Sequence, residues 1–166
     1  MERSKTVCFS GHRTKRLPKG ESLKELENLL YIEICKVVNA GFNTFLFGAC
    51  FGFDFLAASQ VLKIKKEKDL KLIAVVPFRG QEERWPSEWR QRYNNILGQC
   101  DKIMMLHDHY CKESYFDRNR YMVDNSSLII CYYDGGAGGT AQTVNYAKTK
   151  IKVINLYPNY HKDLLP

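Results

Sequence analysis

The segment whose residue types point most directly to chemistry is a turn with four glycines in five positions. It reads Asp134-Gly135-Gly136-Ala137-Gly138-Gly139-Thr140, between an apolar run and a stretch with helical periodicity. Glycine costs about 0.5–1 kcal/mol in backbone entropy, so a simple connection would use fewer of them. At the start of a helix such a turn exposes successive N–H groups to an anion, and the Thr140 hydroxyl adds a donor. We therefore favour a ligand-binding turn over a flexible loop.

A second candidate, Ser10-Gly11-His12-Arg13, directly follows the first apolar run of the chain. Gly11 lets the backbone approach an anion, Ser10 can donate a hydrogen bond, and Arg13 offers a planar fork that suits phosphate. In this interpretation His12 is a ligand contact or a proton donor. In the alternative, His12 caps the neighbouring turn and Arg13 pairs with a surface acid. The residue types alone do not separate the two.

The third candidate spaces two glycines around a turn that opens a helix, and it reads Gly48-Ala49-Cys50-Phe51-Gly52-Phe53-Asp54. Free backbone N–H groups at this place suit phosphate or ribose. Asp54 either contacts a ribose hydroxyl or is an ordinary first-turn residue of the helix. A reactive thiol at Cys50 would need an activating base, and the sequence identifies none.

A loop from Pro77 to Trp85 follows the third apolar run and is expected at the same edge of the fold. It offers Gln81 for hydrogen bonding and Trp85 for stacking on a base or ribose, although Trp85 suits the core equally well.

One predicted helix carries two arginines, Arg118 and Arg120, with Asn119 between them. Arg118 and Asn119 both lie about one turn before Met122, whereas the two arginines diverge by about 200° around the helix. We therefore expect at most one of them in a site, and a solvated arginine pair is the alternative.

The elements that must position these turns alternate between strand and helix patterns. Apolar runs predict strands at about 5–9, 42–47, 71–76, 102–106, 127–133 and 152–156, with Pro77 closing the third. Helical spacing predicts helices from Ser22 to just before Gly41 and at about 54–68, 87–97, 114–124 and 140–150. Ser22 and Glu25 match a capping box, and Gly41 suits the left-handed position after a helix.

This alternation predicts an α/β, Rossmann-like parallel sheet of about six strands with helices on both faces. Right-handed crossovers place the strand-to-helix turns along one edge, where ligands bind near a topological switch. With 166 residues, 45% of them hydrophobic, the chain fits one domain over 1–166 with its core at about 5–156.

Composition narrows the location and the kind of partner. No apolar run approaches the roughly 18 residues of a membrane span, and Met1 to Ser10 lacks the apolar stretch of a secretory signal, so we expect a cytoplasmic protein and no membrane partner. The six cysteines form no C-x-x-C pair, and His107-Asp108-His109 lacks a third ligand, so we expect neither disulfides nor a metal site. The net charge of +7 suits either a mononucleotide or a nucleic acid.

Taken together, the motifs resemble the bacterial YpsA-like family from about residue 5 to 156. They are Ser10-Gly11-His12-Arg13, the Gly-x-x-x-Gly-Phe-Asp turn, Pro77-Phe78, Gln81 with Trp85, Arg118-Asn119-x-x-Met122 and the Gly-Gly-Thr turn. That family belongs to the SLOG superfamily of Rossmann-like domains, with the DNA-processing protein DprA and the cytokinin-activating LOG phosphoribohydrolases. The resemblance implies a nucleotide or nucleotide-derivative site, and many relatives are inferred to be sensors of such ligands.

Two relatives leave alternative functions open. LOG enzymes carry P-G-G-x-G-T-x-x-E with a catalytic glutamate, but Thr143 stands at that place here, and Arg118-Asn119 replaces the LOG Arg-Lys pair. The obvious general acid or base is therefore missing, which leaves catalytic residues unassigned, although Asp54, Glu82 or Glu83 could substitute. Phe116-x-Arg118-Asn119-Arg120 is similar to a DprA motif, which keeps single-stranded DNA open as a partner. No alternation of aromatic and basic residues marks a stacking groove.

We therefore predict a domain that binds a nucleotide or a nucleotide derivative, such as an NAD-like or ADP-ribose-like compound, and acts as a sensor or regulatory module. A LOG-type hydrolase with a non-standard acid and DprA-like DNA binding are the alternatives, and a homo-oligomer stays open. The expected ligand contacts are Ser10, Gly11, His12, Arg13, Gly48, Ala49, Gly52, Asp54, Pro77, Gln81, Trp85, Arg118, Asn119, Asp134, Gly135, Gly136, Gly138, Gly139 and Thr140.

Overall fold

The computed structural model describes residues 1–158, and the last part of the predicted domain, 159–166, lies outside them. Its strands are β1 (Thr6–Gly11), β2 (Thr44–Phe47), β3 (Lys71–Phe78), β4 (Lys102–His107), β5 (Leu128–Tyr132) and β6 (Lys152–Asn155). Its α-helices are α1 (Glu21–Asn39), α2 (Phe53–Ile64), α3 (Ser87–Leu97), α4 (Ser114–Asp124) and α5 (Gly139–Lys148). No helix of the described part is long and apolar enough to cross a membrane.

The six strands form one parallel sheet in the order β4-β3-β2-β1-β5-β6, which confirms the predicted Rossmann-like α/β fold. The chain first builds outward from β1 to β4, and then returns through α4 to place β5 on the other side of β1. The direction of strand addition therefore reverses between β1 and β5. In sheets of this kind, the crevice at such a reversal is where ligands bind.

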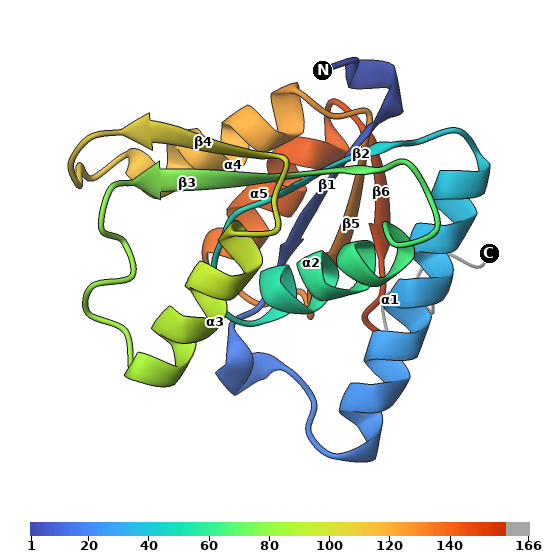
Figure 1. The fold of residues 1–166 in the computed structure, drawn as a ribbon, viewed down its shortest axis with the longest axis horizontal. Coiled ribbons are helices and arrows are strands. Elements are labelled where there is room, and N and C mark those ends of the chain that lie inside the picture. Colours follow the sequence, from blue (N-terminus) through green and yellow to red (C-terminus); the bar gives the residue numbers. More distant parts are fainter. Residues whose placement is uncertain (159–166) are drawn as a thin grey trace.

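Helices cover both faces of the sheet (Figure 1), with α1, α2 and α3 on one face and α4 and α5 on the other. Strand side chains alternate between the two faces, because successive residues of a strand point in opposite directions. Val7 and Phe9 of β1 pack in the core under α1 and α2, whereas Cys8 packs in the core under α4 and α5. Both faces of β1 are thus buried, as its unbroken apolar run predicts.

The start of α1 differs from its predicted start. The helix begins at Glu21, and Gly20 precedes it with a φ of 59° and no capping side chain. Ser22 therefore already lies in the first turn with helical backbone, and the predicted capping box with Glu25 is wrong. The end of α1 is confirmed, since Gly41 has a φ of 95° and the N–H of Phe42 donates to the Val37 carbonyl at 3.1 Å.

Strand β3 runs on through Pro77 to Phe78, so the prediction that proline closes this strand is wrong. The pairing with β2 already ends at Ala74, opposite Phe47, and only β4 accompanies β3 further. Beyond Ala74 the strand has a partner on one side alone, and an edge of this kind tolerates a residue without an N–H group.

Asn155 at the end of β6 fixes the chain just before the glycine-rich turn. It is 2% exposed, its Nδ2 donates to the Tyr133 carbonyl at 2.8 Å, and its Oδ1 accepts from the Tyr133 N–H at 3.0 Å. We predict that Asn155→Ala lowers the free energy of unfolding by about 2 kcal/mol in urea titrations, because two buried backbone groups lose their partners. Asn145→Ala on the exposed face of α5 is the control. Equal losses in both variants would contradict this role.

Candidate functional site

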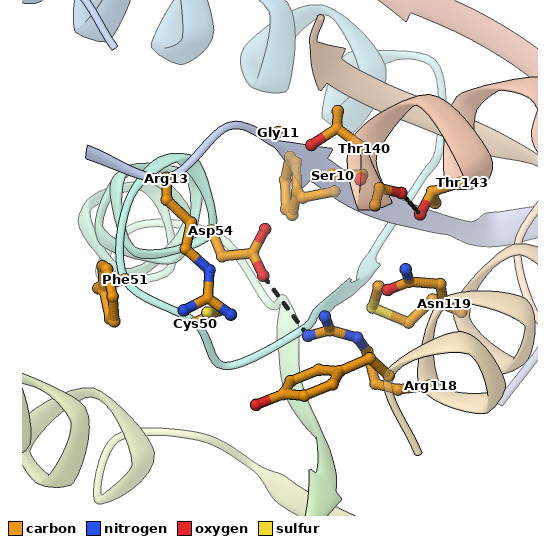
Figure 2. Close-up of a pocket in the computed structure, with 14 residues that line it drawn as sticks. Ser10, Gly11, Arg13, Cys50, Phe51, Asp54, Arg118, Asn119, Thr140 and Thr143 are labelled. Atoms are coloured by element: carbon orange, nitrogen blue, oxygen red, sulfur yellow. Dashed lines mark hydrogen bonds and ion pairs between the residues drawn. The ribbon is translucent and has the colours of Figure 1, made fainter. Parts of the chain in front are cut away.

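A cleft of about 230 Å³ opens at the carboxyl end of β1, beside the reversal between β1 and β5. Four segments of the chain contribute to it: the end of β1 and the residues after it, the β2–α2 turn, one face of α4, and the first turn of α5 (Figure 2). Its lining consists of Phe9, Ser10, Gly11, Arg13, Cys50, Phe51, Asp54, Tyr115, Arg118, Asn119, Met122, Gly139, Thr140 and Thr143.

Arg118 and Asp54 form the polar centre of the cleft. Both side chains are about nine-tenths buried, and Arg118 Nη1 lies 3.9 Å from Asp54 Oδ2. The same Nη1 donates to the carbonyl of Gly48. Burial raises the pKa of Asp54 to about 6, against the opposing influence of Arg118 and Arg13. Figure 2 shows Asp54 between the side chains of these two arginines.

The β2–α2 turn owes both of its glycines to close packing. A Cβ at Gly48 would overlap the Arg118 guanidinium. Gly52 has a φ of 106°, and a Cβ there would come within 2.6 Å of the His12 carbonyl. Between them Ala49 adopts a φ of 51°, and Gln81 Nε2 donates to its carbonyl at 3.0 Å. These residues shape the cleft from behind and do not line it.

Arg13 reaches the cleft from the side opposite Arg118 and Asn119 (Figure 2). Its guanidinium carbon lies 4.9 Å from the centre of the Phe51 ring, a cation–π contact that holds the charge over the β2–α2 turn. The helix that follows this turn is tied to the same segment, since the N–H of Phe53 donates to the His12 carbonyl at 3.1 Å.

The first turn of α5 presents backbone donors to the cleft. Gly138 precedes the helix with a φ of 136°, and no side chain caps the N–H groups that follow. Gly139 and Thr140 line the cleft, and a Cβ built on Gly139 would meet nothing within 4 Å. The Thr143 hydroxyl donates to the Gly139 carbonyl at 2.9 Å. Because the first N–H groups of a helix lack partners inside it, this turn is open to an anion.

The remainder of the glycine-rich turn is held by side chains from the residues after β1. Asp134 accepts two hydrogen bonds from Arg16 Nη2, at 2.6 and 2.7 Å, and lies 2.9 Å from His12 Nε2. Arg16 also donates to the Ala137 carbonyl at 3.3 Å. The Arg16 guanidinium holds the pKa of Asp134 well below its usual range, whereas burial lowers the pKa of His12. His12 is thus buried under the turn, where it supports the backbone.

The loop after β3 lies beside the cleft and forms a second cavity of about 580 Å³. Gln81 and Trp85 line this cavity together with Phe78 and Tyr110, and Tyr115 lines both cavities. Trp85 also packs edge-on against Phe51, with the ring centres 5.0 Å apart. The two cavities are therefore neighbours that share Tyr115.

Eight of the nineteen predicted contacts line the cleft, and they are Ser10, Gly11, Arg13, Asp54, Arg118, Asn119, Gly139 and Thr140. The other eleven do not line it, and they are His12, Gly48, Ala49, Gly52, Pro77, Gln81, Trp85, Asp134, Gly135, Gly136 and Gly138. Of these, Gln81 and Trp85 line the adjoining cavity. As the helical geometry predicts, only one arginine of α4 faces the cleft, since the Arg120 guanidinium lies over Phe116, 4.1 Å from the ring centre.

Lining residues absent from the predicted set are Phe9, Cys50, Phe51, Tyr115, Met122 and Thr143. Helical spacing carries a signal for three of them. Tyr115 lies three residues before Arg118 and Met122 four residues after it, and Thr143 lies three residues after Thr140. Cys50 is buried, and burial raises the pKa of its thiol.

Together the fold and the cleft define a Rossmann-like α/β domain with a polar, arginine-lined cleft at the topological switch of its sheet. The family model YpsA, described as the YspA SLOG family, matches residues 7–165. The chain belongs to this family.

Two proteins are similar to this chain in sequence over most of its length. The uncharacterized SPbeta prophage-derived protein YoqJ of Bacillus subtilis strain 168 is 28% identical over 137 residues, which cover 72% of this chain and 80% of YoqJ. A UPF0398 protein of Brevibacillus brevis is 27% identical over 137 residues, covering 78% of this chain and 73% of its own.

Among solved structures, DNA processing protein A (DprA) of Streptococcus pneumoniae aligns with a TM-score of 0.62 and 17% identity, over 92% of this chain and 50% of that one. DprA of Helicobacter pylori, whose structure concerns a single-stranded DNA binding mode, aligns with a TM-score of 0.58 and 18% identity, over 87% of this chain and 60% of that one. This chain thus spans about half of the two DprA chains, and the likeness shows a shared fold.

The ionisation of Asp54 reports directly on the polar centre of the cleft. We predict that its carboxyl titrates near pH 6 in carbon-detected NMR, and that Arg118→Met moves the pKa higher because a neighbouring positive charge is lost. Arg120→Met on the same helix is the control and should leave the titration unchanged. Because the pKa of Asp54 in the folded protein lies above its ordinary value of 3.8, the stability that this carboxyl contributes is full below pH 3.8 and is lost as the pH rises through about 6. Titration near pH 3.8 would contradict the geometry.

Proposed function

We propose that this protein binds a nucleotide or nucleotide derivative in the cleft at the reversal between β1 and β5, and that it acts as a sensor or regulatory module. The observation that carries the proposal is the meeting of the uncapped start of α5 with Arg13 and Arg118 in one cavity. These groups supply backbone donors, positive charge and a helix dipole, which are the features that recognise phosphate.

The phosphates would lie against the first turn of α5. The N–H groups at Gly139 and Thr140, the Thr140 hydroxyl and the Ser10 hydroxyl are donors at this wall of the cleft. Arg13 stands on the opposite rim with an exposed side chain, so it can close over a bound anion. The glycine at 139 leaves the space that a phosphate oxygen needs.

Ribose hydroxyls would lie deeper, at Asp54 and Asn119. Asp54 is an acceptor within the cleft, and Asn119 offers both a donor and an acceptor. Arg118 Nε is buried and has no hydrogen-bond partner among the described residues. A ligand oxygen would satisfy this donor, which otherwise leaves a desolvated N–H group unpaired.

The adjoining cavity favours a ligand with a second part. A cleft of about 230 Å³ is smaller than the sites of whole drug-sized ligands, which run to about 300–1,000 Å³. Tyr115 lines both cavities, and Phe78, Trp85 and Tyr110 add aromatic surface beyond it. An ADP-ribose-like or NAD-like compound would place its phosphates in the cleft and a ring on these side chains.

Binding without turnover is favoured because Thr143, which has no carboxylate, stands at the place of the catalytic LOG glutamate. Thr143 is 2% exposed, and its hydroxyl donates to the Gly139 carbonyl within α5. Asp54 is the acidic side chain of the cleft lining, whereas Glu83 lines the adjoining cavity.

Anion binding at α5 is tested by a charge placed inside the cleft. We predict that Gly139→Glu weakens the binding of ADP-ribose or AMP at least tenfold in isothermal titration calorimetry, which corresponds to about 1.4 kcal/mol. The fold should persist, because the new Cβ meets nothing and an acid suits the start of a helix. Gln142→Glu adds the same charge on the exposed side of α5 and is the matched control.

Arg13→Ala should weaken the binding of the same ligands to a similar degree. Arg90→Ala, at an exposed position of α3 outside the cleft, removes the same charge and should have little effect on binding. Unchanged affinity in both cleft variants, or equal losses in cleft and control variants, would refute the phosphate assignment.

Single-stranded DNA is a second candidate ligand, favoured by the likeness to DprA and by the net charge of +7. If the chain binds the phosphates of DNA through its basic side chains, fluorescence anisotropy with a short labelled oligonucleotide should show a logarithm of the binding constant that falls steeply and linearly with the logarithm of the salt concentration. A flat salt response, or no binding at low salt, would exclude this candidate.

A further inference from the structure

A thiol, an imidazole and a carboxylate meet outside the cleft, between the end of β4 and the start of α4. Figure 1 shows the loop that joins these two elements. The Sγ atom of Cys111 lies 4.0 Å from His107 Nδ1, and His107 Nε2 lies 3.0 Å from Asp117 Oδ2. His107 is the last residue of β4, and Asp117 is in the first turn of α4. Two elements of regular structure therefore hold the base and its partner on either side of the loop that carries the thiol.

The contact with Asp117 selects the tautomer of His107. A carboxylate accepts hydrogen bonds, so the proton of a neutral imidazole resides on Nε2, facing Asp117. Nδ1 is then an acceptor, and it faces the Cys111 thiol. This is the arrangement in which a third group orients a base toward a nucleophile, and such distances are often longer before a reactant binds.

Ser114 supplies a second group to the sulfur. Its hydroxyl is fully buried, lies 3.0 Å from Cys111 Sγ, and accepts a hydrogen bond from the Cys111 N–H at 2.9 Å. With a lone pair engaged by that N–H, the single hydroxyl hydrogen is available to the sulfur. A donor at this distance stabilises the sulfur when it carries negative charge.

The other cysteines lack this environment. Cys8, Cys50 and Cys131 are buried, and burial raises the pKa of each. The Cys100 thiol donates to the Ile96 carbonyl, and burial raises its pKa to about 12. Cys111 is partly exposed, as is Cys35 on α1, which makes Cys35 a reference within the same molecule.

We propose that Cys111 is a nucleophilic thiol that undergoes thiol–disulfide exchange with a low-molecular-mass disulfide, with His107 as its base and Asp117 as the positioning residue. His107 Nδ1 accepts the proton of the thiol, and the sulfur attacks one sulfur of the disulfide. A new S–S bond forms as the old one breaks, and the leaving thiolate takes up the proton from His107. Cys111 is thereby oxidised to a mixed disulfide, and the other half of the disulfide is reduced to a thiol.

Glutathione disulfide at pH 7 is the probe, with the modification of each cysteine followed by peptide mass spectrometry over time. In the wild-type protein Cys111 should react roughly tenfold faster than Cys35. His107→Asn should slow Cys111 by at least about tenfold while leaving Cys35 unchanged, since the base is lost. His109→Asn, two residues further along the loop, is the matched control and should not change the rate.

Asp117→Asn supplies a second test, because an amide can donate to Nε2, which places the proton of the neutral imidazole on Nδ1 and so removes the acceptor that faces the thiol. It should slow Cys111 to a similar extent. Modification of buried Cys8 or Cys131 shows that a variant is unfolded. The rate of Cys111 in the other of the two variants, His107→Asn or Asp117→Asn, then tests the proposal. A Cys111 that reacts no faster than Cys35, or a rate indifferent to His107 and Asp117 in folded variants, would overturn the proposal.

Discussion

The burial of Arg118 against Asp54 and the Gly48 carbonyl is the interaction on which the cleft depends. It joins α4, which crosses back over one face of the sheet, to the turn between β2 and α2. A buried arginine is tolerated only when a partner offsets its lost hydration, and removing one partner of such a pair typically costs about 3–5 kcal/mol. The positions of Gly48 and Asp54 therefore follow from the need to receive this guanidinium.

That constraint explains why the turns around the cleft are built from special backbone. Gly48 leaves room for the guanidinium, Ala49 takes a positive φ, and Gly52 lets α2 start directly against the segment after β1. The positive φ of Ala49 is costly for a residue with a side chain, and this cost is offset by the groups that the turn brings together. The same centre leaves the buried Arg118 Nε without a hydrogen-bond partner in the described part of the chain.

The alternation of strands and helices could be predicted from the sequence, because buried parallel strands are continuous apolar runs and the helices carry apolar stripes. Three of the four cleft-forming segments could also be predicted, since glycines and polar residues directly after strands mark the ligand-binding edge of such a sheet. The fourth, on α4, is indicated by the helical spacing of Arg118, Asn119 and Met122. The sequence did not predict which residues of these segments line the cleft and which ones support the backbone. His12, Gly48 and Gly52 have the same types as ligand contacts, yet they support the backbone from behind.

Long-range side-chain links explain the rest of the difference. Arg16 and Asp134 are 118 residues apart, and nothing local to Arg16 indicates that it holds the glycine-rich turn. The extension of β3 through Pro77 depends on where β2 ends beside it, which is a property of the sheet. The cluster of His107, Cys111 and Asp117 likewise forms only when β4 and α4 fix the loop between them.

The central claim is that the start of α5 and the end of β1 together receive the phosphates of a nucleotide ligand. The most direct measurement is a titration of isotope-labelled protein with ADP-ribose, followed by amide chemical shifts. The account predicts saturable shifts that are largest at Gly11, Gly139 and Thr140, with smaller ones at Asn119. Saturable shifts confined to another surface, such as the groove between α2 and α3 lined by Ser59 and Asn95, would contradict it.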